Sequence, residues 1–277
     1  GTRHLLLAVC DHYEPYRDHA APETARAYVA RWRREYPERF SNVRDADGRM
    51  PQHTFFYPEE EYDPYCLDAL GHLMRQGCGE VEIHLHHRND TPDGLREKLA
   101  RFRDLLRNEH GMLGSFSSPL PTEAWGGSRQ APPPRFAFIH GNWALCNSRP
   151  DGDWCGVNEE LGILQATGCY ADFTFPSAPS PTQPRMVNSI YRATDNPNGR
   201  GHDRGIRLAV RRAKDITTTI SGGQGEGHAG LGGSVPRTGP AKWPSPWPER
   251  PLLLIQGPLT LNFRRRKYRL LPRIENA

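Results

Sequence analysis

Imidazole and carboxylate side chains gather at the ends of three apolar segments of the chain. The segments cover residues 4–10, 80–86 and 135–139. The side chains at their ends are Asp11 and His12, then His84, His86 and His87, and lastly His140. The chain contains only 12 histidines, so this concentration beside a carboxylate is more than chance would give. Imidazole and carboxylate together are a typical ligand set for Zn²⁺ or a related divalent ion, so we expect a metal or catalytic site, although any one histidine could equally well just end a strand.

The spacing of the middle histidines indicates which of them face the same site. Side chains alternate along a strand, so His84 and His86 lie on one side, opposite the alternating apolar residues of this segment. The apolar residues suit packing beneath helices, which leaves His84 and His86 facing inward. His87 faces the other way unless the strand has already ended, so we expect it to contribute less to metal binding than His84.

Strand-sized apolar segments alternate with amphipathic, helix-sized segments along the chain. We expect strands over residues 4–10, 53–57, 80–86, 135–139, 169–175 and 251–263, with weaker strand patterns at 190–191, 206–210 and 216–220. We expect helices over residues 22–39, 65–75, 92–111 and 159–168, with Thr91 and Asn158 as N-caps of the last two. This alternation predicts an α/β fold with a parallel sheet or barrel, in a single domain that spans residues 1–277. The Gly- and Pro-rich stretches at 111–134 and 222–248 indicate long loops at one face of the sheet.

Composition excludes several classes of protein. Hydrophobic residues make up 36% of the 277 residues and charged residues 25%, which excludes a wholly disordered chain. The net charge of +4 is too small to argue for a nucleic-acid partner, and no apolar run approaches the roughly 18 residues of a membrane span. The six cysteines are scattered without a CxxC motif, which favours free thiols and a cytoplasmic location. The chain begins with Gly1 rather than Met, so a secretion signal or a longer parent protein would also fit.

The strand-end motifs resemble those of the NodB-homology polysaccharide deacetylases, carbohydrate esterase family 4. Ala8-Val-Cys-Asp11-His12 stands where that family has Thr-Phe-Asp-Asp, and Glu80-Val-Glu-Ile-His84 matches its Glu-Ile-x-x-His strand. Ile139-His-Gly-Asn-Trp143 occupies the place of its Arg-x-Pro-x-Gly motif. The resemblance covers most of the chain in order and spacing, with substitutions that fit a divergent member. It implies a deformed (β/α) barrel.

The same resemblance implies the cofactor and the roles of the strand-end residues. Family members hold a divalent metal, usually Zn²⁺ although Ni, Co or Mn are possible, with one Asp and two His. A second Asp is their general base. Asp11 then falls on the base, His12 on the metal-binding Asp and His84 on the first metal-binding His. The family spacing puts Arg88 at the second His, so His86, His87 or Asp90 has to complete the set.

The general acid is missing from its place in the resemblance, because Gln256 stands where the last strand of the family carries a histidine. Imidazole titrates near neutral pH, so His140 could take the role, or else His202 or His228. His140 could equally be a strand-end residue bonded to backbone.

Aromatic loop residues and one strand-end carboxylate suggest how a sugar would bind. The tryptophans outside the helices are Trp143, Trp154, Trp243 and Trp247. Exposed aromatic faces stack on sugar rings, so Trp143 suits a carbohydrate site, although such residues also cover long loops. Asp172, near the end of a strand, could contact a sugar hydroxyl or a cation.

Together these observations predict a metal-dependent hydrolase that removes an acyl group, such as acetyl, from a sugar or polysaccharide. One alternative is a metal-independent glycoside hydrolase on the same barrel, with Asp11, Glu14 or Asp172 forming its carboxylate pair. Another is a non-catalytic glycan-binding domain. The oligomeric state is open.

Overall fold

The computed structural model describes residues 5–113, 134–208, 251–267 and 271–276. The strand expected at 216–220 and the residues His228, Trp243 and Trp247 lie outside these ranges.

Eight strands form one mostly parallel sheet in the order β1-β2-β3-β4-β5-β8-β6-β7. Every pairing from β1 through β5 to β8 is parallel, whereas the pairings of β6 with β8 and with β7 are antiparallel. The parallel strands are β1 (Cys10–His12), β2 (His53–Pro58), β3 (Gly79–Leu85), β4 (Phe136–His140), β5 (Cys169–Asp172) and β8 (Leu252–Ile255). The other two are β6 (Ile190–Ala193) and β7 (Gly205–Arg207). The expected α/β fold with a parallel sheet is confirmed at this level.

Four α-helices accompany the sheet in the described ranges: α1 (Pro22–Phe40), α2 (Pro64–Arg75), α3 (Pro92–Asn108) and α4 (Glu160–Ala166). Three of these helices begin with proline, which is favourable because the first N–H groups of a helix have no hydrogen-bond acceptor within it. Thr91 caps α3 as expected, because its side chain accepts a hydrogen bond from the backbone N–H of Gly94. The cap expected at Asn158 is wrong. Its side chain instead donates to the carbonyl oxygen of Pro197.

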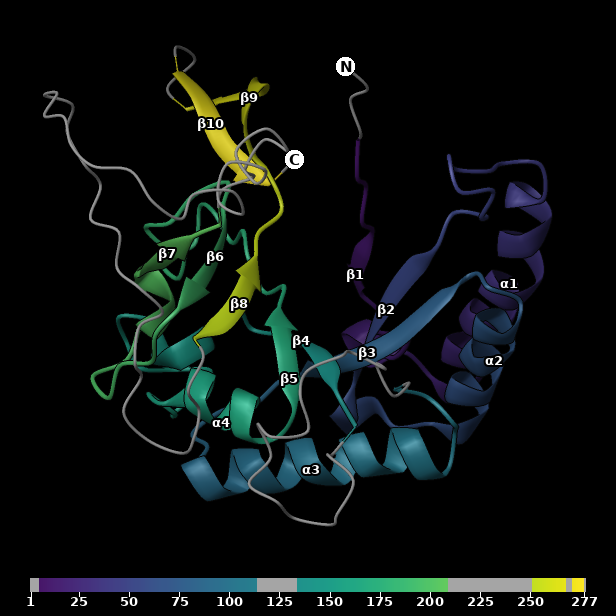
Figure 1. Cartoon of the computed structure of the whole chain (residues 1–277), viewed down its shortest axis with the longest axis horizontal. Coiled ribbons are helices and arrows are strands. Elements are labelled where there is room, and N and C mark those ends of the chain that lie inside the picture. The colour runs from purple at the N-terminus through teal and green to yellow at the C-terminus, as the bar shows by residue number, and fades with distance from the viewer. Residues whose placement is uncertain (1–4, 114–133, 209–250, 268–270, 277) are drawn as a thin grey trace, which may run out of the picture.

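The two faces of the sheet have different surroundings. One face, the helix face, carries Ile83 and Leu85 of β3, which belong to the main core together with residues of the helices. The other face, the inner face, carries a small apolar cluster of Phe56, Ala137 and Ile139. Figure 1 shows the curved sheet with α1, α2 and α3 outside it. The alternation predicted for β3 is therefore confirmed.

The first strand begins later than the sequence predicts. Leu5, Leu6 and Leu7 are 93%, 93% and 85% exposed, and ladder pairing with β2 covers only Cys10–His12. Asp11 and His12 are consequently strand residues rather than residues beyond the strand end. Their side chains point to opposite faces of the sheet, because alternation continues through both.

The last predicted strand, 251–263, is two strands. β8 ends at Ile255, and β9 (Leu259–Lys267) leaves the sheet to pair with β10 (Leu271–Asn276) in a separate antiparallel hairpin. Gly257 and Pro258 lie at the break, which is where residues that interrupt a ladder are expected.

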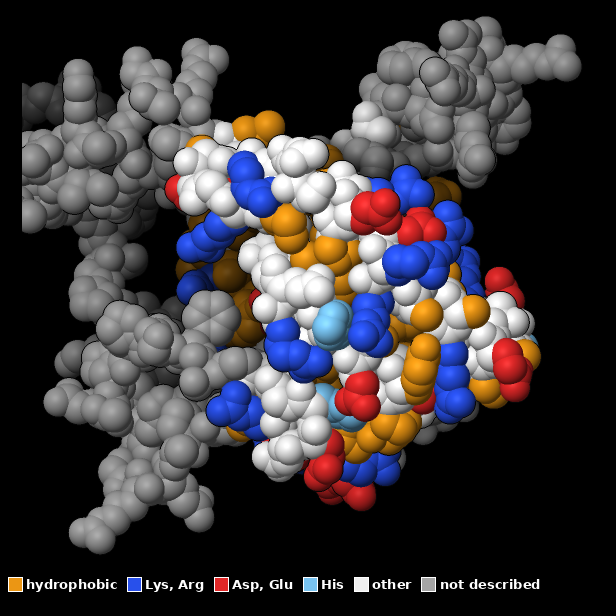
Figure 2. Space-filling view, turned by 90° about the vertical axis from the view of Figure 1, so that its right-hand side faces the viewer, with side chains coloured by type: hydrophobic (Ala, Val, Ile, Leu, Met, Phe, Trp, Pro, Cys, Tyr) orange, Lys and Arg blue, Asp and Glu red, His pale blue; other side chains and the backbone are white. Residues whose placement is uncertain are grey.

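The surface beside α1 and α2 mixes both signs of charge. Figure 2 shows Lys and Arg side chains interspersed with Asp and Glu on this side of the molecule. On α1, for example, Glu35 pairs with Arg31 and Arg39 at 2.9 and 2.8 Å. None of the helices in the described ranges is long and apolar enough to cross a bilayer. All six cysteines are free thiols, as expected.

Candidate functional site

Three residues from two strands form a cluster on the inner face of the sheet, which we call the open cluster. It consists of His12 at the end of β1, Glu14 just after it and His84 on β3, and their ligand atoms lie within 4.8 Å of one another. β1 and β3 both run parallel to β2, so their carboxyl ends meet at one edge of the sheet. His12 and His84 have ring centroids 4.8 Å apart, which fits the predicted convergence of these two residues.

The carboxylate of Glu14 lies at the centre of the open cluster. Its Oε1 atom is 3.2 Å from His84 Nε2, 3.6 Å from His12 Nδ1 and 3.6 Å from His86 Nε2. Zinc bonds to nitrogen and oxygen are about 2.0–2.2 Å long, so the edges of a tetrahedral site are about 3.3–3.6 Å. His12, Glu14 and His84 therefore form a compact donor group, with distances from the carboxylate oxygen close to those in a zinc site, and His86 lies beside it.

A second carboxylate fixes the orientation of His86. Its Nδ1 atom forms a short hydrogen bond with Glu60, which lies in the single helical turn Glu59–Glu61 after β2. Glu60 also accepts a hydrogen bond from the backbone N–H of His86 at 3.2 Å. The proton is thereby held on Nδ1, which leaves the Nε2 lone pair facing Glu14. Gly141 supports the ring from behind, because a Cβ at this position would overlap the imidazole of His86.

The charge states of the open cluster suit a cation. Burial lowers the pKa of His84 to about 4, helped by the neighbouring His12 and His86, so this imidazole is neutral at neutral pH. Burial acts to raise the pKa of Glu14, but hydrogen bonds from His12 and His84 outweigh it, and the pKa falls well below its usual range. Burial acts to lower the pKa of His86, and the hydrogen bond and charge of Glu60 outweigh it, so the pKa rises above its ordinary value. A neutral imidazole and an ionised carboxylate are the forms that bind metal.

The open cluster is accessible from one side. The side chains of His12 and His86 are 27% and 30% exposed, whereas His84 is fully buried. Trp143 is 42% exposed, and its ring lies 5.6 Å from that of His12. An indole face thus borders the accessible side of the cluster.

Comparisons of the chain with protein-family models, with curated proteins and with solved structures found no match.

Asp11, the predicted general base, does not face the open cluster. Its carboxylate is directed across β1 toward the helix face, where Oδ2 lies 3.4 Å from His53 Nε2. His53 packs against Trp32 of α1. The cause is that β1 continues through His12 rather than ending at Cys10, so alternation places Asp11 and His12 on opposite faces. The structure does not bring Asp11 to the histidines, and its role stays a prediction.

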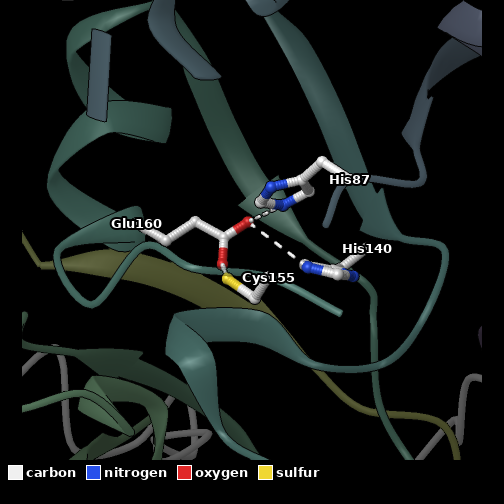
Figure 3. A group of neighbouring side chains, drawn as sticks. All are labelled: His87, His140, Cys155 and Glu160. Carbon is white, nitrogen blue, oxygen red and sulfur yellow. Dashed lines mark hydrogen bonds and ion pairs between the residues drawn. The ribbon is translucent and has the colours of Figure 1, made fainter. Parts of the chain in front are cut away.

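His87 and His140 belong to a second cluster, which we call the buried cluster. It joins them to Cys155 and Glu160 on the helix side of the sheet, and all four side chains are buried. Figure 3 shows the carboxylate of Glu160 between the two imidazoles and the thiol. His87 Nε2 is 3.1 Å from Glu160 Oε1, and His140 Nε2 is 3.9 Å from the same atom. The predicted acid His140 thus has no exposed surface from which to reach a substrate.

Two further candidates are also buried. Asp172 accepts hydrogen bonds from the hydroxyl and the backbone N–H of Thr174 at 2.7 and 3.2 Å, and burial raises its pKa to about 7. A carboxyl group without exposed surface cannot contact a sugar directly. His202 is likewise buried, with its ring 4.9 Å from that of Phe175.

Sequence patterns did not predict Glu14 as the centre of the open cluster, Glu60 beside it, or Cys155 and Glu160 of the buried cluster. Glu14 carried a usable signal, because it follows His12 by two residues and alternation puts both on one face. Glu60 could have been suspected from its place directly after a strand. Cys155 and Glu160 carried no signal, since an irregular segment and a short helix bring them under the sheet.

Proposed function

We propose that the chain is a metal-dependent hydrolase that removes an acyl group from a sugar or polysaccharide, on a deformed (β/α) barrel. The observation that carries the proposal is the spacing of the Glu14 carboxylate and the surrounding imidazole nitrogens, at 3.2–3.6 Å. The ion is held by His12, Glu14 and His84, whose donor atoms form one compact group. Two imidazoles and one carboxylate are a common catalytic zinc set, which keeps a fourth position open. Nickel, cobalt or manganese would fit the same donors.

The ion contributes one part of the chemistry, which is to polarise an acyl carbonyl and to lower the pKa of a water molecule. The rest falls to side chains around it. His86 takes a proton from the attacking water on Nε2, and its own Nδ1–H remains bonded to Glu60. The carboxylate of Glu60 stabilises the imidazolium that results. The same imidazolium then returns the proton to the leaving amine or alcohol, so one side chain serves in turn as base and as acid.

In this proposal His86 transfers the proton, rather than Asp11 or His140, which were the residues predicted from the sequence. A general base needs hydrogen-bond reach to the reacting water, and Asp11 faces the opposite side of β1. His140 is fully buried. His86 is one-third exposed and adjoins the donor group, with Nε2 at 3.6 Å from the Glu14 oxygen.

Carbohydrate is the proposed substrate because of the indole beside the metal ligands. The exposed face of Trp143 lies next to His12, where it can stack on the apolar face of a sugar ring and present its acyl group to the ion. The alternative of a metal-independent glycosidase needs two carboxylates across one substrate. Two of the carboxylates predicted for that role have other partners. Asp11 faces His53, and Asp172 is buried against Thr174.

Acetate release tests this proposal. The purified 277-residue chain is incubated with N-acetylated and O-acetylated oligosaccharides after treatment with chelator and again after addition of Zn²⁺. We expect acetate from at least one substrate class, loss of the activity with chelator and recovery with zinc. The His72→Ala variant, altered in a surface histidine of α2 that contacts Gln76, should behave as wild type. Activity that is unaffected by chelator, or no acetate from any acylated saccharide with zinc present, would overturn the proposal.

A further inference from the structure

The buried cluster draws its side chains from four separate places in the chain. His87 follows β3, His140 ends β4, Cys155 lies in the irregular segment 141–159, and Glu160 begins α4. One ligand atom from each lies within 4.8 Å of all the others. Such convergence in the interior needs an explanation, because buried polar groups are costly unless they are paired.

The protein partners of these groups do not complete the cluster. His140 Nε2 is buried and has no hydrogen-bond partner among the described residues, and it points toward Glu160 Oε1 at 3.9 Å. That distance is too long for a hydrogen bond, and a small movement of the ring would bring the nitrogen to the ligand spacing of a zinc site. The cluster therefore contains a buried nitrogen that is directed at its centre and has no hydrogen-bond partner among the described residues.

The sulfur of Cys155 lies between backbone N–H donors and the carboxylate of Glu160, and burial raises its pKa, so without a cation it is a thiol. Its sulfur accepts hydrogen bonds from the backbone N–H groups of Asn147 and Val157 at 3.3 and 3.4 Å. N–H donors directed at a sulfur stabilise the negative charge of a thiolate. The thiol donates a hydrogen bond to Glu160 Oε2 at 3.4 Å, and a cation bound between sulfur and oxygen would take the place of that proton.

A second carboxylate, that of Asp90, lies beside the outer nitrogen of His87. Asp90 Oδ2 lies 3.3 Å from Nδ1 of His87 and is itself held by Lys98 at 2.7 Å. Nδ1 makes no hydrogen bond within the described residues, but the negative charge beside it favours a proton on Nδ1, and a cation bound at Nε2 would replace the hydrogen bond that joins Nε2 to Glu160 Oε1 at 3.1 Å.

We infer that His87, His140, Cys155 and Glu160 hold a structural zinc ion beneath the sheet. One thiolate, one carboxylate and a divalent cation sum to zero charge, which suits a site that has no solvent. Sulfur and nitrogen donors favour zinc over magnesium or calcium. Four protein ligands leave no open position for a substrate, so the ion is structural. His140 closes the site with its proton on Nδ1, and the backbone N–H of Asn142 then gives up its present 3.2 Å contact with that atom.

The ion would stiffen the segment that carries Trp143. Segment 141–159 has several non-glycine residues with positive φ, among them Trp143, Cys146 and Trp154, and it contains a single helical turn at Leu145–Asn147. Backbone in that region is strained and persists only when surrounding contacts hold it. A metal bond to Cys155 and ligands at both flanks, His140 and Glu160, would hold the segment in place.

The thiol distinguishes this site from the open cluster, which offers only nitrogen and oxygen donors. Cobalt-substituted wild-type protein should therefore show a thiolate-to-cobalt charge-transfer band in the near ultraviolet. The band should disappear in Cys155→Ser and persist in Cys78→Ser, where the altered thiol is also buried but packs in the hydrophobic core and donates to the Gln76 carbonyl. A band that is missing from wild type, or that survives in Cys155→Ser, would overturn the inference.

X-ray absorption at the zinc edge gives an answer that does not depend on a Cys155 variant folding. The His84→Ala variant, whose open cluster has lost a ligand, should still bind zinc with one sulfur neighbour at about 2.3 Å. Zinc with nitrogen and oxygen neighbours only, or no zinc, would contradict the buried site. Neither result bears on acyl hydrolysis, so failure here is separable from failure of the proposed function.

Discussion

Glu14 Oε1 lies 3.2 Å from His84 Nε2, although 70 residues separate the two in the sequence. β1 and β3 bring them together as the two neighbours of β2, with Pro58 of β2 directly opposite His84. The contact would be an ordinary buried ion pair if His84 were protonated. Burial and neighbouring histidines lower the pKa of His84 to about 4, so near pH 7 the pair is a neutral imidazole and a carboxylate, which suits a shared cation.

Replacement of His84 by alanine should remove the ion of the open cluster. We expect His84→Ala to bind one metal ion fewer per chain than wild type, because two donors cannot hold zinc at the affinity of three. Metal analysis after dialysis measures the content, and circular dichroism verifies the fold. His72→Ala is the matched histidine control. Equal metal content in wild type and His84→Ala would show that His84 is not a ligand.

His86 and Glu60 should control the rate and its pH dependence rather than metal content. His86→Gln should retain the ion and lose about 10²–10⁴-fold in kcat, the usual contribution of a general acid–base group. The base form of His86 is neutral, so activity should increase as pH rises through its pKa. Glu60 raises this pKa, and Glu60→Gln should therefore move the acidic limb of the kcat profile to lower pH. An acidic limb of the kcat profile at the same pH in wild type and Glu60→Gln would show that Glu60 does not set the pKa of the catalytic base.

The indole beside the open cluster should affect substrate binding. Trp143→Ala removes a stacking surface worth about 0.5–1.5 kcal/mol, which corresponds to roughly a 2- to 12-fold increase in KM with little change in kcat. The Trp143→Phe variant should recover part of the loss. An unchanged KM in Trp143→Ala for every acylated saccharide would place the sugar elsewhere.

A buried carboxyl on the inner face should give the fold a distinct pH dependence. Glu82 accepts hydrogen bonds from the Ala137 N–H and the Tyr170 hydroxyl, and burial raises its pKa from 4.5 to about 8. The folded pKa exceeds the unfolded one, so this contribution to stability is complete below about pH 4.5 and is lost as pH rises through about 8. The loss is at most about 1.4 kcal/mol per pH unit.

Glu82→Gln should remove that dependence, because an amide does not ionise. Chemical denaturation at a series of pH values should show a free energy of unfolding that falls less between pH 5 and pH 8 in Glu82→Gln than in wild type, by about 1 kcal/mol or more. Parallel curves for the two proteins would show that Glu82 does not titrate differently on unfolding.

The strand and helix pattern was predictable because it depends on local periodicity. The alternation in β3 placed His84 and His86 on the face opposite Ile83 and Leu85, and the structure agrees. The start of β1 was not predictable in the same way. Three consecutive leucines suggested burial, but pairing with β2 decides where a strand begins, and pairing is a tertiary property.

The same limit explains the candidate site. His12 and His84 were found because they end strands, whereas the direction of Asp11 depends on where β1 ends, because its side chain alternates with that of His12 only if the strand includes both. Cys155 and Glu160 approach His87 and His140 through an irregular segment whose path no periodicity reveals. Periodicity therefore predicts the positions of residues on strands and helices, but not of residues on irregular segments.

Anomalous diffraction at the zinc edge, from crystals of the full chain grown with Zn²⁺, tests the central claim most directly. We predict an anomalous difference peak on the inner face of the sheet, at about 2.0–2.2 Å from Glu14 Oε1, His12 Nδ1 and His84 Nε2. A map from zinc-containing crystals without a peak among these three atoms would contradict it.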